Sequence, residues 1–287
     1  MKSIICAIIT AALALPTAAA DVAIPVHGLW VWKSPTVLRA AQGMQALDQF
    51  CRSAGITEIY VSVPAHPDSL EEQELQQLVG RLHDSKVRVE ALISSTNADE
   101  EGAPRTKLLD HVRWVLQFNQ RHTQQRFDGV HLDIEPQQRP ENKGPGNLGF
   151  LAGLAAAFRD VRTLTDAARM TLNADIQNKL LKGNLEQRRL LLSSVSRVTL
   201  MLYELSSPDD GTTTVDKIDK IKQSSEKFLE MAYQGLEAQG LARMAIALRT
   251  PDYGPLLPQM LSALDAANRG NAHYLGWARH SYNDALP

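Results

Sequence analysis

One short segment of the sequence, residues 127–136, carries three ionisable side chains at alternate positions: His131, Asp133 and Glu135. Apolar residues fill the positions between them, as expected for a strand whose two faces meet different surroundings. An imidazole and two carboxyl groups are costly to bury unless they are paired or reach solvent. Packing alone does not explain this face, so it indicates a site for chemistry.

The position of Glu135 favours acid catalysis. Pro136 follows it and is predicted to end the strand, which places Glu135 at the strand's C-terminal end. A second carboxyl group two residues earlier, together with burial, raises the pKa of such a group, which then keeps a proton at neutral pH and can donate it. Two other interpretations stay open: a structural network of Asp, His and Glu, and a metal site built from the imidazole and the carboxylates.

Short runs rich in β-forming residues alternate with stretches of helical spacing along the chain. The predicted strands are residues 28–32, 58–63, 87–93, 129–135, 170–176, 198–203, 244–248 and 273–277. The predicted helices are residues 38–51, 70–83, 108–118, 148–164, 218–236 and 257–267 and, with the least regular spacing, 180–192. Eight strands separated by helices predict a single-domain α/β fold, a (β/α)8 TIM barrel. A doubly wound open sheet is the alternative, but no glycine-rich phosphate loop follows the first strand.

Such a barrel carries its binding and catalytic groups at the C-terminal ends of the strands. Asp175, near the end of the predicted fifth strand, is therefore a candidate binding residue. Trp30, in the first strand, could stack on a ring of a bound substrate, although packing in the core explains it equally well.

The segment around Glu135 also resembles a known signature. Asp128-Gly129-x-His131-x-Asp133-x-Glu135 is similar to the Asp-Gly-x-Asp-x-Asp-x-Glu motif of family 18 glycoside hydrolases, the chitinases and their relatives. The resemblance implies a barrel enzyme that cleaves N-acetylhexosamine glycans with retention. Glu135 would donate the proton to the glycosidic oxygen, and Asp133 would orient the substrate's 2-acetamido group as it attacks its own anomeric carbon. His131 departs from the family pattern, which has an aspartate there.

A second segment, Met201-Leu202-Tyr203-Glu204, is similar to the family's Met-x-Tyr-Asp. The resemblance implies that the Tyr203 hydroxyl helps to hold the acetamido group, with Glu204 replacing the aspartate. Trp277 is similar to the tryptophan that forms the floor of the sugar subsite in the family. The predicted substrate-binding set is therefore Asp128, His131, Asp175, Glu204, Trp277 and Trp30.

The first twenty residues have the charged, apolar and small-residue regions of a secretory signal. We predict cleavage after Ala20, a barrel domain over residues 21–287 and a periplasmic or secreted protein; an uncleaved N-terminal anchor is the alternative. Cys6 lies inside the signal, which leaves Cys51 as the one cysteine of the mature chain. No intrachain disulfide is therefore expected.

Charge and composition narrow the functional classes. The 287 residues include 30 Lys and Arg against 32 Asp and Glu, a net charge of −2, without long runs of one sign. This balance argues against nucleic acid and membrane surfaces as partners. The leading interpretation is an exported glycosidase with an oligosaccharide or polysaccharide substrate, no metal and no cofactor. A non-catalytic glycan-binding barrel and a metal-dependent hydrolase are the alternatives.

Overall fold

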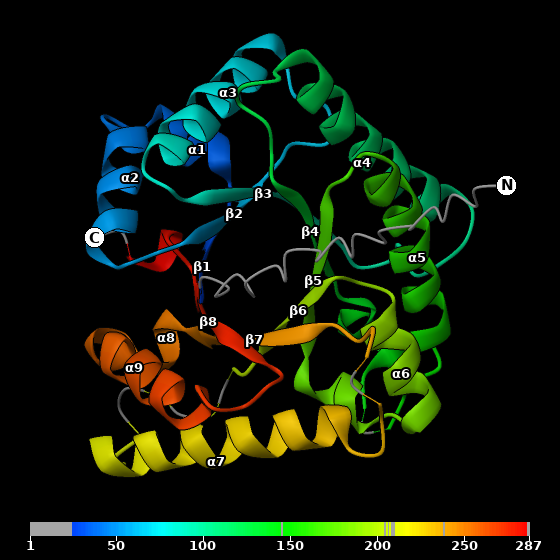
Figure 1. Cartoon of the computed structure of the whole chain (residues 1–287), viewed down its shortest axis with the longest axis vertical. Helices are drawn as coiled ribbons and strands as arrows, with labels where there is room; N and C mark the ends of the chain where they lie inside the picture. Colours follow the sequence, from blue (N-terminus) through cyan, green and yellow to red (C-terminus); the bar gives the residue numbers. More distant parts are fainter. Residues whose placement is uncertain are drawn as a thin grey trace, which may run out of the picture.

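The computed structural model describes residues 25–285 except 145, 204, 206, 208, 209 and 238. Parallel strands form a closed barrel in which each strand pairs with its neighbours in the sequence and β8 closes on β1 (Figure 1). The strands are β1 (Val26–Val31), β2 (Glu58–Ser62), β3 (Arg88–Ser95), β4 (Gly129–Ile134), β5 (Thr171–Gln177), β6 (Arg197–Met201), β7 (Arg243–Arg249) and β8 (Tyr274–His280). The prediction of a (β/α)8 barrel is confirmed.

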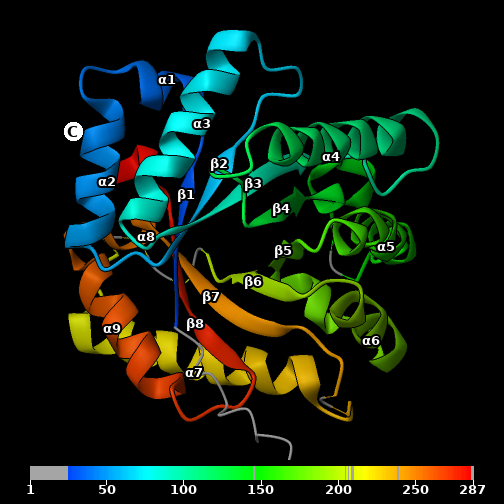
Figure 2. The ribbon, with the colours of Figure 1, turned by 45° about the horizontal axis from the view of Figure 1, so that its top comes forward.

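Helices surround the barrel and cover its outer face (Figures 1 and 2). They are α1 (Ser34–Arg39), α2 (Gly43–Ser53), α3 (Ser69–Asp84), α4 (Ala103–Arg121), α5 (Leu151–Ala167), α6 (Leu185–Ser193), α7 (Thr214–Tyr233), α8 (Thr250–Tyr253) and α9 (Leu257–Asn268). None of these helices, within the part of the chain that the structure describes, is long and apolar enough to cross a bilayer.

Two of the predicted helices are divided in the structure. The first is broken between α1 and α2, where Gln42 has a φ of 58° and a Cβ on Gly43 would lie 1.9 Å from the carbonyl oxygen of Val37. The second consists of a 3-10 turn, η3 (Asn178–Lys182), followed by α6. There the side chain of Asn184 accepts a hydrogen bond from the Gln187 amide and starts the new helix.

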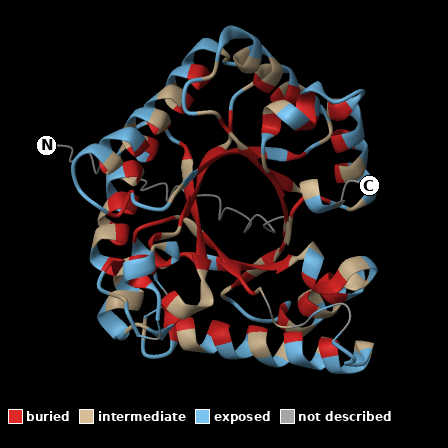
Figure 3. Cartoon of the chain, turned by 180° about the vertical axis from the view of Figure 1, so that it is seen from behind, coloured by how far each residue is buried: buried red, intermediate tan, exposed pale blue. Residues whose placement is uncertain are grey.

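The barrel separates two hydrophobic cores. Outside the strands, apolar side chains pack against the inner faces of the helices, and Figure 3 shows this buried ring with exposed residues on the outer helix faces. Inside the strands lies a smaller cluster of Trp30, Tyr60, Leu92, Ala247 and Ala278. The large rings fit because small residues face them. A Cβ on Gly28, for example, would lie 2.3 Å from the Tyr60 hydroxyl oxygen.

An ionic layer fills the N-terminal end of the barrel interior. The Arg197 guanidinium contacts Glu58 at 2.9 Å and Glu90 at 2.6 Å, and the Tyr60 hydroxyl donates to Glu58 at 2.7 Å. Asn173 donates to Glu90 at 2.5 Å. Because both buried carboxylates are paired, this layer can support charged groups further up the barrel.

Cys51 is a free cysteine on the buried face of α2, and burial raises the pKa of its thiol to about 12. A thiol with so high a pKa is unreactive at neutral pH. The predicted signal, residues 1–20, and with it Cys6, lies outside the described residues.

Candidate active site

The inward face of β4 carries the ionisable series from the barrel interior to its mouth. His131 is fully buried, Asp133 is buried, and Glu135 directly follows the strand and is half-buried. The neighbouring strand β5 presents Asp175 and Gln177 on its own inward face, and both contact the β4 series. The site is therefore built from two adjacent strands at the C-terminal end of the barrel.

His131 is held between two carboxylates. Its Nδ1 lies 3.1 Å from Glu90, its Nε2 lies 2.7 Å from Asp175, and its ring stacks on Tyr60 at 3.8 Å. Burial alone would lower the pKa of His131, but the charges and hydrogen bonds of Asp175 and Glu90 outweigh it and raise the pKa to about 10. At neutral pH His131 is therefore an imidazolium that donates from both ring nitrogens.

Trp30 holds the other oxygen of Asp175. The indole Nε1 of Trp30 donates to Asp175 Oδ2 at 3.0 Å, while Oδ1 accepts from His131. Trp30 is only 1% exposed, so its ring lies below the mouth rather than open to it. The interpretation of Trp30 as a sugar-stacking ring is corrected: it is a core residue that fixes Asp175.

Asp133 lies between the anchored Asp175 and the mouth. Its Oδ1 is buried and has no hydrogen-bond partner among the described residues. Burial, followed by the charges of Asp175 and Glu135, raises the pKa of Asp133 well above its ordinary value. Burial and the neighbouring carboxylates therefore favour the protonated form of Asp133.

Glu135 is surrounded by glutamine amides. Gln177 donates to Oε1 at 2.8 Å, Gln137 donates to the same oxygen at 3.2 Å, and Gln138 donates to Oε2. Burial raises the pKa of Glu135, the charge of Asp175 acts in the same direction, and the amide hydrogen bonds oppose them. The net direction is upward, as an acid catalyst requires.

Tyr203 approaches the same region from the end of β6. Its hydroxyl is buried without a hydrogen-bond partner among the described residues, and the Arg249 guanidinium lies 5.6 Å from its ring centre. Burial, then the charges of Asp175, Asp133 and Glu135, raise the pKa of Tyr203 well above its ordinary value. The hydroxyl thus keeps its proton and is available as a donor.

Two predicted binding residues lie elsewhere. Asp128 precedes β4 at its N-terminal end, where its carboxylate accepts from the Val89 amide at 2.7 Å and contacts His83 at 2.9 Å. It ties β4 to the neighbouring β3 and α3, so the prediction that it binds substrate is corrected.

Trp277 lies on the wrong face of β8 for a subsite floor. Its ring stacks on His27 at 4.3 Å and lines a cavity with α9 residues outside the barrel. The inward positions of β8 are Ala278, in the interior cluster, and His280, whose ring lies 5.5 Å from that of Tyr203. Side chains alternate along a strand, so a shift of one residue reverses the face. Glu204 lies outside the described residues.

Sequence reasoning missed Gln177 and Glu90. The spacing of Asp175 and Gln177, two residues apart on one strand, is the signal that could have identified Gln177. Glu90 is a charged residue between two apolar ones, Val89 and Ala91, within a predicted strand, which is unusual unless it is paired.

The interpretation of the β4 series as metal ligands finds no support in the geometry. Both ring nitrogens of His131 already contact carboxylates. Among the described residues, no group of three His, Cys, Asp or Glu side chains is arranged to hold a metal ion.

Comparison with known proteins shows the fold. No protein-family model and no curated protein matches the sequence. The crystal structure of a chitinase from Chromobacterium violaceum ATCC 12472 superposes with a TM-score of 0.55 at 12% identity, over 90% of this chain and 94% of that one. The spore cortex-lytic enzyme SleL of Bacillus cereus matches with a TM-score of 0.50 at 11% identity, over 78% of this chain and 49% of SleL, about half its length. The chain thus has a chitinase-like (β/α)8 barrel fold.

Proposed function

We propose that the protein is an exported glycoside hydrolase that cleaves a glycan containing N-acetylhexosamine, with Glu135 as the general acid. The likeness of the barrel to a chitinase and the raised pKa of a carboxyl group at its mouth support this proposal. Retention of configuration with assistance by the substrate follows from the resemblance of the β4 segment to family 18.

The observation that carries the proposal is a pair of unsatisfied buried polar atoms, Asp133 Oδ1 and the Tyr203 hydroxyl. Buried polar groups in folded proteins nearly always have partners, so these two atoms are available to hydrogen-bond a ligand. A 2-acetamido group offers one N–H donor and one carbonyl acceptor, which match an Asp133 oxygen and the Tyr203 hydroxyl.

The reaction then proceeds in two steps. Glu135 gives its proton to the glycosidic oxygen, the bond from that oxygen to the anomeric carbon breaks, and the acetamido oxygen bonds to the anomeric carbon. Water next attacks this carbon, returns a proton to the Glu135 carboxylate and releases the acetamido oxygen. Asp133 and Tyr203 hold the acetamido group in line throughout.

The Tyr203→Phe variant tests the acetamido contact. It removes the hydroxyl without changing the ring, and we expect kcat/KM on N-acetylglucosamine oligosaccharides to fall roughly 10- to 100-fold, the loss of a hydrogen bond to a developing charge. Oligosaccharides without the acetyl group should be poor substrates for both proteins. The control is Tyr274→Phe, which removes a hydroxyl at the start of β8 and should leave activity unchanged. Equal activity of Tyr203→Phe and wild type would contradict the assignment.

A second candidate is a barrel that binds glycan without cutting it. The observation in its favour is the set of three amide donors on Glu135, because hydrogen bonds to a carboxylate stabilise its deprotonated form. Calorimetric binding of an N-acetylglucosamine oligosaccharide, with no product after long incubation, would select this candidate over the hydrolase.

Export is the remaining part of the proposal and rests on the sequence of residues 1–20. We expect the mature protein from a secreting host to begin at Asp21, which mass spectrometry of the intact chain would measure. A mass that includes residues 1–20 would contradict cleavage.

A further inference from the structure

A cavity of about 380 Å³ lies between the loops that lead into α5 and α6. Its walls include Leu148, Gly183, Gln187 and two lysines, Lys179 and Lys182. The two loops follow β4 and β5, the strands that carry Glu135 and Gln177, and α5 and α6 lie side by side in Figure 1. The cavity therefore opens on the face of the barrel where substrate binds. We call it the lysine pocket.

The two lysines of this pocket have no direct salt-bridge partner among the described residues. Neither Lys179 nor Lys182 forms an ion pair or hydrogen bond with any of the described residues. Arg139, in the preceding loop, is by contrast paired with Asp99 at 2.8 Å and Glu100 at 2.7 Å. Lys179 is half-buried and Lys182 is exposed. Two ammonium groups that line one hollow repel each other, which an anion bound between them would offset.

Lys179 lies near the reacting groups. It follows Gln177, which donates to Glu135, by two residues. Burial lowers the pKa of Lys179, and the charge of Glu135 opposes this, so the two groups are close enough to interact. The loops that form the lysine pocket thus continue directly from the two strand ends that carry Glu135 and Gln177.

We propose that the lysine pocket binds a carboxylate on the glycan, so that the substrate is an acidic N-acetylhexosamine polymer rather than a neutral one. This inference rests on the proposed function and adds the substrate class. Chitin has no ionised group at neutral pH and would leave both lysines unpaired. A carboxylate can reach such a pocket from two chemical sources, a lactyl ether on an N-acetylhexosamine or a neighbouring uronic acid.

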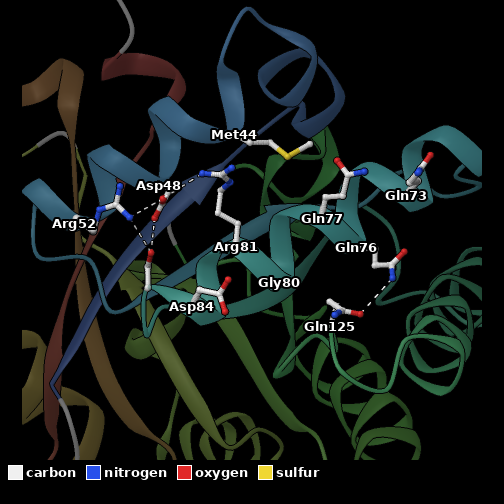
Figure 4. Close-up of a pocket in the computed structure, with 11 residues that line it drawn as sticks. Met44, Asp48, Arg52, Gln73, Gln76, Gln77, Gly80, Arg81, Asp84 and Gln125 are labelled. Atoms are coloured by element: carbon white, nitrogen blue, oxygen red, sulfur yellow. Dashed lines mark hydrogen bonds and ion pairs between the residues drawn. The ribbon is translucent and has the colours of Figure 1, made fainter.

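A larger cavity of about 820 Å³ lies between α2 and α3 (Figure 4), but its buried charge already has partners. Its buried Asp48 is paired with Arg52 at 2.7 Å and Arg81 at 3.7 Å, and Gln76 donates to Gln125 at 3.3 Å. Its buried charge, Asp48, is thus already paired, and the cavity lies outside the barrel.

Calorimetry measures glycan binding to the Glu135→Gln variant, which should bind the glycan without cleaving it. The probes are three tetrasaccharides: chitotetraose, alternating N-acetylglucosamine and N-acetylmuramic acid, and alternating N-acetylglucosamine and glucuronic acid. We expect one acidic probe to bind roughly 5- to 20-fold more tightly than chitotetraose, with an advantage that shrinks at high salt. The acidic probe that binds more tightly identifies the source of the carboxylate.

Adding Lys179→Gln and Lys182→Gln should abolish this advantage and leave chitotetraose binding unchanged. The control is Lys220→Gln, an exposed lysine on α7. Equal binding of acidic and neutral probes, or an advantage that survives removal of both lysines, would overturn the proposed carboxylate site but not the proposed hydrolase. Failure of every probe to bind would overturn the proposed function as well.

Discussion

The Glu135→Gln variant is expected to lose hydrolysis by roughly 10²- to 10⁴-fold, while its folding stability and its affinity for glycan stay close to wild type. A glutamine amide has the shape of the carboxyl group but cannot give a proton to the glycosidic oxygen. Its carbonyl oxygen can still accept from Gln177, so the local structure is retained. Turnover of a fluorogenic N-acetylglucosamine oligosaccharide measures the effect.

Glu141→Gln is the matched control, because Glu141 lies in the same loop but is exposed and pairs with Arg139. It should leave turnover unchanged. The acid must be protonated to act, so the wild-type rate should fall as pH rises through the raised pKa of Glu135. Unchanged turnover in Glu135→Gln would remove Glu135 from the mechanism.

Replacing His131 with alanine is expected to lower the free energy of unfolding by about 3 to 5 kcal/mol. The substitution leaves Glu90 and Asp175 buried without their shared cation. Urea denaturation of both proteins measures the difference. His83→Ala is the control: His83 pairs with Asp128 in a partly exposed position, and its loss should cost less than about 1 kcal/mol.

The difference in unfolding free energy between wild type and His131→Ala should depend on pH. The folded-state pKa of His131 is raised from 6.5 to about 10, so its stabilisation is complete below pH 6.5 and is lost as pH rises through 10. The pKa of Glu90 is lowered from 4.5 to about 2, because Arg197 and His131 outweigh its burial; its contribution is complete above pH 4.5 and is lost as pH falls through 2. The gap between wild type and His131→Ala should therefore narrow from pH 6.5 to pH 10. A difference that widens with pH would contradict a charged His131. The His131→Gln variant keeps one hydrogen-bond donor, so its free energy of unfolding should lie between those of wild type and His131→Ala.

The barrel could be predicted from the sequence because its signals are local. Apolar alternation over a few residues defines each strand, and helical spacing defines most of the connecting helices. The same alternation placed His131, Asp133 and Glu135 on one face without any knowledge of the fold.

The partners of these residues depend on contacts between distant parts of the chain. Glu90 reaches His131 from β3, and Asp175 reaches it from β5, because the register of the closed sheet aligns them. One sequence does not contain that register. The position of Trp30 inside the barrel also depends on the closed sheet. There it is a buried donor to Asp175 and not an open stacking surface.

The residue type of Trp277 and its place near the end of a strand were not enough to predict which face of the strand it lies on. A family motif indicates which strand carries a residue, but the face depends on the strand's register. Here β8 shifts against β7 between Met244 and Ala245, and His280 takes the inward position near Tyr203. Asp128 is similar: it belongs to the motif but lies at the opposite end of β4 from Glu135, where it contacts β3 and α3.

The most direct test is hydrolysis by the purified, folded protein of a panel of fluorogenic N-acetylglucosamine oligosaccharides, chitin fragments and peptidoglycan, with Glu135→Gln in parallel. We predict that wild type releases product from at least one N-acetylhexosamine substrate and that the variant, under the same conditions, releases at least 100-fold less. Equal release by the two proteins, or no release by either from the whole panel, would contradict a glycosidase that uses Glu135 as its acid.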